Sequence, residues 1–115
     1  MSFEPRDYLR HILVEADYLL KSSEHLTFDA FQADETLRRA FVRSVEVIGE
    51  AAKKVPESFR AEHPGIKWRA ITGMRDRLIH DYFGIDYEIV WDVVRHRIPE
   101  LRQQIAAILS NRDDG

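Results

Sequence analysis

The sequence predicts an all-α protein, an antiparallel four-helix bundle that forms a single domain over residues 1–115. Apolar residues recur at helical spacing through most of the chain. No segment alternates polar and apolar residues for long enough to predict a strand. Short stretches with proline or glycine separate the periodic segments, which is typical of bundles whose successive helices run antiparallel.

The first helix is expected from Pro5 to about Ser23, because proline suits the first turn of a helix. Its apolar face would consist of Leu9, Ile12, Leu13, Ala16, Leu19 and Leu20. A polar connection that contains Phe28 and Phe31 is expected to follow.

A second long helix is expected after Asp34, a plausible N-cap, and should end before Pro56. Its apolar face would consist of Leu37, Phe41, Val45, Ile48 and Ala52. Residues 56–66 contain two prolines and one glycine, which predicts a loop with a short turn of helix.

A third helix is expected over residues 67–80, and a last helix over residues 86–109, with a break at Gly84 between them. The apolar face of the last helix would consist of Val90, Val93, Val94, Leu101, Ile105 and Ile108. Pro99 must kink or restart this helix, because proline lacks the N–H donor and crowds the preceding turn.

The composition favours a folded, soluble protein, since 44% of the residues are apolar and 32% are charged. The absence of cysteine excludes disulfides and thiolate metal sites. The N-terminus has no signal-like apolar run, and no segment approaches the roughly 18 apolar residues that a membrane span needs. We therefore expect a protein of the prokaryotic cytoplasm that does not enter a membrane.

The net charge of −3 conceals an asymmetry. Residues 1–36 carry three basic and eight acidic side chains, a net charge of −5, so the remaining residues carry +2. Two stretches are basic: Lys67, Arg69, Arg75 and Arg77 outweigh Asp76, and Arg95, Arg97 and Arg102 follow in the last helix. Each stretch fits either a surface that binds a short piece of RNA or an ordinary solvated helix face.

The strongest chemical signal is Arg75 five positions before His80, with Tyr82 two positions further on. A histidine with a pKa near neutrality can take a proton from a ribose 2′-hydroxyl or give one to the leaving 5′-oxygen. An arginine offers a planar fork of donors to the phosphate as charge builds on it. As a bare pattern this spacing is common, so its setting has to support it.

The two side chains do not converge on one ideal helix. Arg75 falls within the apolar arc of the third helix, where a charge must be paired or line a cleft. His80 lies about 140° away around the helix axis. Either the helix unwinds at or just before His80, or a second copy of the chain completes the site, and Gly73 would let another helix approach closely.

Asp76 and Tyr82 each allow two interpretations. Asp76 stands four positions before His80, so it either supports the imidazole and raises its pKa, or forms an ordinary surface ion pair. Tyr82 either packs on the core or exposes its hydroxyl beside the site. Neither the other histidines nor Glu46 with Glu50 show the spacing of a metal site, so we expect no metal and no cofactor.

Longer runs around the motif carry a family resemblance. Residues 68–86 read Trp-Arg-Ala-Ile-Thr-Gly-Met-Arg-Asp-Arg-Leu-Ile-His-Asp-Tyr-Phe-Gly-Ile-Asp, and residues 47–54 read Val-Ile-Gly-Glu-Ala-Ala-Lys-Lys. With Val90-Trp91 and Ile98-Pro99-Glu-Leu101, they resemble the HepT family of HEPN-domain proteins along essentially the whole chain.

The resemblance implies a small helical homodimer that acts as the toxin of a type VII (HEPN/MNT) toxin–antitoxin module. The implied partner is a minimal nucleotidyltransferase (MNT) antitoxin. The implied activity is metal-independent RNA cleavage by an R-x(4–6)-H-x-Y motif that meets its symmetry mate at the dimer interface. By this resemblance Arg75 and His80 are the catalytic pair, and Tyr82 is the tyrosine that the antitoxin modifies with AMP. Asp76 stands where the family commonly has asparagine, so it either supports His80 or weakens RNA binding.

We therefore expect a homodimer whose two Arg75/His80 pairs line a shared cleft. There a 2′-hydroxyl would attack the adjacent phosphodiester of tRNA or mRNA and leave a 2′,3′-cyclic phosphate. Two alternatives stay open. One is a non-catalytic module that presents a substrate to a nucleotidyltransferase or regulates it. The other is a structural helical dimer in which Arg75 only satisfies a carboxylate such as Glu46 or Glu50.

Overall fold

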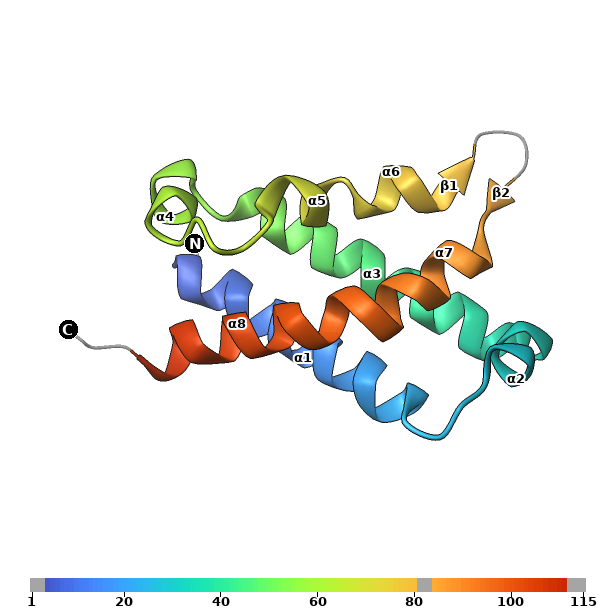
Figure 1. Cartoon of the computed structure of the whole chain (residues 1–115). Helices are drawn as coiled ribbons and strands as arrows, with labels where there is room; N and C mark the ends of the chain where they lie inside the picture. Colours follow the sequence, from blue (N-terminus) through green and yellow to red (C-terminus); the bar gives the residue numbers. More distant parts are fainter. Residues whose placement is uncertain (1–3, 81–83, 112–115) are drawn as a thin grey trace.

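The computed structural model of the chain describes residues 4–80 and 84–111, and these confirm the all-α fold class (Figure 1). Successive long segments run in opposite directions, as expected for an antiparallel arrangement (Figure 1). Helix α1 (Pro5–Ser23) packs against both α3 (Glu35–Lys54) and the C-terminal α8 (Ile98–Ser110). The place of a fourth long helix beside α3 is taken by two short ones, α5 (Trp68–Thr72) and α6 (Met74–Leu78).

The first two long helices have the predicted bounds. Pro5 lies in the first turn of α1, and the side chains of Glu4 and Asp7 form a capping box there. The carboxylate of Asp34 accepts a hydrogen bond from the backbone N–H of Leu37 at 3.1 Å, so it caps α3 as predicted. Most residues of the predicted apolar faces are buried in the core.

The segment after α1 differs from the prediction of a polar connection, because it contains helix α2 (Phe28–Ala33). The hydroxyl of Thr27 caps this helix by accepting from the N–H of Ala30 at 3.1 Å. Phe31 is fully buried, with ring centroids 5.0 Å from Phe41 and 5.4 Å from Trp91. The burial of this aromatic side chain therefore stabilises a helix that local sequence does not indicate. Further along, α4 (Glu57–Glu62) is the short turn of helix expected within residues 56–66.

The predicted third helix over residues 67–80 is wrong in two respects. It is interrupted at Gly73, and it ends at Leu78 rather than at His80. Beyond it, β1 (Ile79–His80) pairs antiparallel with β2 (Gly84–Ile85), with His80 opposite Gly84. Gly84 has a φ of +78°, which only glycine adopts readily, so the predicted break at this position is confirmed. Two-residue strands are too short to produce an alternating pattern in the sequence.

The last helix restarts near Pro99, as one of the two predicted alternatives required. Asp86 caps α7 (Tyr87–Asp92) by accepting from two backbone N–H groups. A π-helical turn, η2 (Val93–Arg97), joins α7 to α8, and the N–H of Ile98 donates to the carbonyl of Val93 across it. Pro99 then lies in the first turn of α8, where its missing N–H costs no helical hydrogen bond. Within the described ranges, no helix is long and apolar enough to cross a membrane.

Candidate functional site

The motif residues lie where the chain leaves α6 and enters the short β1–β2 pair (Figure 1). Arg75 and Asp76 belong to α6, and the backbone of His80 belongs to β1. Tyr82 and the imidazole of His80 lie outside the described residues. The structure therefore places two of the four predicted side chains, together with the path of the backbone that carries the third.

Arg75 lies on the surface and not in the apolar arc where the sequence placed it. Its side chain is 51% exposed, whereas the neighbouring Met74 and Leu78 are buried. The predicted arc holds for Met74 and Leu78 of α6, which are buried, and fails for Arg75, which lies about 100° from Met74 around the helix axis and so at the margin of the buried face.

Two carboxylates flank the Arg75 guanidinium. Its Nε lies 3.7 Å from Oε2 of Glu46 on α3, and its Nη1 lies 3.8 Å from Oδ1 of Asp76. Both distances exceed those of hydrogen bonds, so the carboxylates act on Arg75 mainly through charge. Glu46 is 21% exposed, whereas Asp76 is 79% exposed. The expectation that Arg75 must be paired is therefore met, although it is not buried.

The backbone supports one of the two ways in which Arg75 and His80 could approach each other. The helix ends two residues before His80, so the 140° separation of an ideal helix does not apply. For the same reason Asp76 and His80 do not have the helical i, i+4 relation on which their expected contact depended. The completion of the site by a second copy of the chain stays a prediction.

Gly73 lies between α5 and α6, and its expected close approach to a helix of a second copy stays a prediction. A Cβ atom on Gly73 would meet the carbonyl oxygen of Arg69 at 3.2 Å, in the preceding turn of its own chain. Gly73 therefore marks the junction between α5 and α6. Close approach of another helix within the described protomer occurs instead at Gly49 of α3, whose Cβ would lie 3.4 Å from the carbonyl oxygen of Ile71.

Two basic residues at the start of α5, Lys67 and Arg69, line different grooves. Lys67 lines a groove between α5 and α8 together with Arg97 and Glu100. Arg69 lines another groove, between α4 and α5, together with Arg60. Arg60 carries no signal in the sequence, because only the tertiary packing of α4 brings it beside Arg69.

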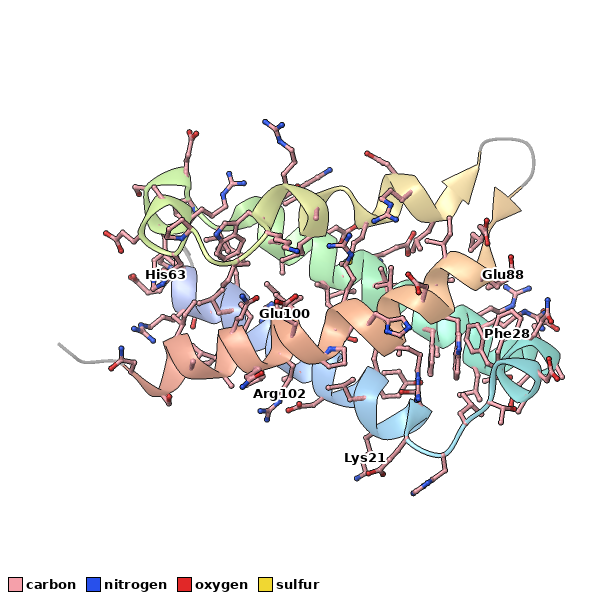
Figure 2. All side chains as sticks on the ribbon, viewed as in Figure 1. Lys21, Phe28, His63, Glu88, Glu100 and Arg102 are labelled. Atoms are coloured by element: carbon pink, nitrogen blue, oxygen red, sulfur yellow. The ribbon has the colours of Figure 1, made fainter. Side chains whose placement is uncertain are left out.

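The second basic stretch is also divided. Arg102 donates to the Asp17 carboxylate on α1 at 2.7 Å, and this hydrogen bond raises the pKa of Arg102 above its usual value. Arg95 donates to the carbonyl of Ser23 and lies over the ring of Trp91. Figure 2 shows Glu100 and Arg102 projecting from different sides of α8. Of these arginines, only Arg97 lines the groove beside α5.

Among the side chains that the structure describes, no group of three or more histidine, aspartate or glutamate residues could hold a metal ion. Glu46 faces Arg75, while Glu50 is exposed and lines a separate pocket between α1 and α3. Metal independence of any reaction stays a prediction, since only an activity measurement can test it.

Comparison with known proteins identifies relatives over nearly the whole chain. A family profile described as "Ribonuclease HepT-like" matches residues 9–108. The chain is 49% identical to "Putative RNase TTE0752" of Caldanaerobacter subterraneus subsp. tengcongensis, over 91% of this chain and 94% of that protein. It is 40% identical to "Putative RNase MJ0127" of Methanocaldococcus jannaschii, over 92% of this chain and 88% of that protein.

A further relative is "Probable ribonuclease HepT" of Thermococcus cleftensis, with 38% identity over 84% of this chain and 88% of that protein. No solved structure matched the chain. The family profile and these identities agree with the resemblance carried by residues 47–54 and 68–86. The chain therefore belongs to the HepT-like ribonuclease family.

Proposed function

We propose that this protein is a metal-independent endoribonuclease and the toxin of a type VII (HEPN/MNT) toxin–antitoxin module. The observation that carries the proposal is the placement of the motif in a member of this family. An exposed arginine on α6 is followed, beyond the helix end, by a histidine on a short strand. Arg75 is accessible to a phosphate, and His80 follows it on backbone that has left the helix.

The proposed chemistry needs one proton acceptor, one proton donor and one anion binder. A histidine removes the proton from the ribose 2′-hydroxyl, and the 2′-oxygen attacks the adjacent phosphorus. A second histidine protonates the leaving 5′-oxygen, so the products are a 2′,3′-cyclic phosphate and a 5′-hydroxyl. Arg75 stabilises the charge that develops on the phosphate oxygens. One chain carries one such motif, so a homodimer with a shared cleft supplies both histidines. The substrate is tRNA or mRNA.

The first experiment compares RNA cleavage by the purified wild type and His80→Ala. We expect His80→Ala to abolish cleavage, while circular dichroism and the melting temperature stay nearly unchanged because residue 80 lies outside the helices. Cleavage by the wild type should persist in a chelator. Inhibition by the chelator that a divalent ion reverses would contradict the metal-free mechanism, and sequencing of the RNA ends would identify the products.

A second candidate function has one observation in its favour. Arg75 is flanked by Glu46 and Asp76, as it would be if it only paired with carboxylates. In that case the protein would be a structural helical dimer that does not cleave RNA. A double-mutant cycle at Arg75 and Glu46 that shows coupling in stability, with no change in RNA cleavage, would favour that function.

A further inference from the structure

Glu46 is the described side chain that joins the candidate site to the rigid part of the fold. We propose that Glu46 is a positioning residue, which orients the Arg75 guanidinium for the scissile phosphate. This inference rests on the proposed ribonuclease function. Glu46 would act through Arg75 and would not itself touch the RNA.

Glu46 is well held. It lies in the 20-residue helix α3, between the fully buried residues Val45 and Ile48. Its own side chain is four-fifths buried, and Nη1 of Arg43 lies 3.8 Å from its Oε1. Two guanidinium groups flank this partly buried carboxylate and stabilise it in this position. Moving the carboxylate away from them would leave its charge uncompensated.

Arg75, by contrast, comes from a five-residue helix that is interrupted on one side and followed by a two-residue strand on the other. Such an element supplies few contacts of its own to fix a long side chain. Helix α5, which precedes α6 in the chain, approaches the backbone of α3 closely at Gly49, one turn after Glu46. The position of Glu46 relative to α6 is therefore fixed by packing, and the carboxylate can orient Arg75.

The atoms of the contact between Glu46 and Arg75 explain why this contact would favour the binding of a phosphate by Arg75. The nearest contact of Glu46 is with Nε of Arg75, at 3.7 Å, rather than with the terminal pair of nitrogens, Nη1 and Nη2. A phosphate can be bound by such a pair of parallel N–H groups. Asp76 differs, because it lies 3.8 Å from Nη1 itself and would compete with a phosphate there.

The test uses Glu46→Gln, which removes the charge and keeps the shape of the side chain. The matched control, Glu35→Gln, lies on the same helix and removes an exposed ion pair to Arg39 with a distance of 2.7 Å. Cleavage is measured under single-turnover conditions with saturating protein, and RNA affinity is measured separately for each variant in the His80→Ala background.

We expect Glu46→Gln to lower the cleavage rate constant about 10- to 100-fold, the cost of a misplaced catalytic group, while RNA affinity changes less than about threefold. Glu46→Asp, which keeps the charge, should recover part of the rate. Glu35→Gln should cleave within about twofold of the wild type, since Glu35 pairs with Arg39 and not with Arg75 or Glu46. The melting temperature of Glu46→Gln should resemble that of Glu35→Gln.

Three results would overturn the proposal while leaving the ribonuclease function intact. The first is wild-type cleavage by Glu46→Gln. The second is an equal loss of affinity and rate, which would place Glu46 in RNA binding. The third is an equal loss of the cleavage rate in Glu46→Gln and Glu46→Asp, with a lowered melting temperature in both. That result would assign Glu46 to stability alone. Failure of the wild type to cleave any RNA would instead contradict the proposed function itself.

Discussion

At the scale of single residues, Arg75 is half-exposed on α6 and lies between the carboxylates of Glu46 and Asp76, which partly offset its charge. Counting 100° per residue assigns Arg75 to the buried arc, whereas α6 buries only Met74 and Leu78. The chemical identity of the candidate pair could be found in the sequence, because arginine and histidine have specific roles toward RNA. The partner of Arg75 could only be offered as one of two glutamates. The choice of Glu46 over Glu50 depends on how α3 packs against α6.

Asp76 gives a testable consequence of the charges around Arg75. We expect Asp76→Asn to tighten RNA binding about two- to fivefold, because it removes a negative charge 3.8 Å from the nitrogen that would bind phosphate. The affinity is measured at several salt concentrations in the His80→Ala background. Asp29→Asn is a matched control, since it makes the same change of net charge at an exposed position on α2.

The same substitution distinguishes the two roles considered for Asp76. If Asp76 supports the imidazole of His80, Asp76→Asn should reduce cleavage by an otherwise wild-type protein even when binding is tighter. A decrease in cleavage without any gain in affinity would contradict the idea that Asp76 competes with RNA for Arg75.

At the scale of elements, the sequence predicts helices well where local signals determine them. Asp34 and Pro5 mark helix starts, and Pro99 marks the restart of the last helix. Helix α2 was missed because its stability comes from Phe31 packing against distant aromatic rings. The end of α6 was missed because the N–H of Asp86 donates to the carbonyl of Leu78 at 2.8 Å, next to the paired β1 and β2, and no local pattern encodes this contact.

The close approach of α3 and α5 predicts the effect of a larger side chain at Gly49. A Cβ there would already lie 3.4 Å from the Ile71 carbonyl oxygen, so the methyl groups of Gly49→Val should push α5 outward. We expect a loss of about 1–3 kcal/mol in the free energy of unfolding, measured by urea denaturation. Gly65→Val is the control, because the space around the Gly65 Cβ position is open. Equal free energies of unfolding of the two variants would mean that α5 can move outward without destabilising the protein.

At the scale of the whole molecule, a cleft shared by two protomers predicts unusual behaviour of mixed dimers. His80→Ala and Arg75→Ala homodimers should each be inactive, because each lacks both copies of one catalytic group. A heterodimer of the two variants keeps one arginine and one of the two histidines that the proposed reaction uses, so we expect its cleavage activity to differ from that of either homodimer and to stay below that of the wild type. Differently tagged subunits can be co-expressed and purified through both tags. A heterodimer as inactive as both homodimers would argue against a site that combines residues of two chains.

Regulation by the proposed antitoxin leads to a prediction for Tyr82, which follows His80 by two residues. An AMP group on its hydroxyl would bring a bulky anion close to the site of the RNA phosphate and block it by volume and by repulsion. Co-expression with the cognate nucleotidyltransferase should therefore add one or more AMP masses on Tyr82 and silence the nuclease.

The matched variant is Tyr82→Phe, which lacks only the hydroxyl. If that hydroxyl has no part in cleavage, Tyr82→Phe should escape modification and stay toxic to cells that also contain the nucleotidyltransferase. Mass spectrometry of the co-purified proteins and growth of the co-expressing cells provide the two measurements. An inactive complex in which Tyr82 carries no AMP would show that the partner inhibits by binding alone, since the nuclease would be silenced without any covalent change at this residue.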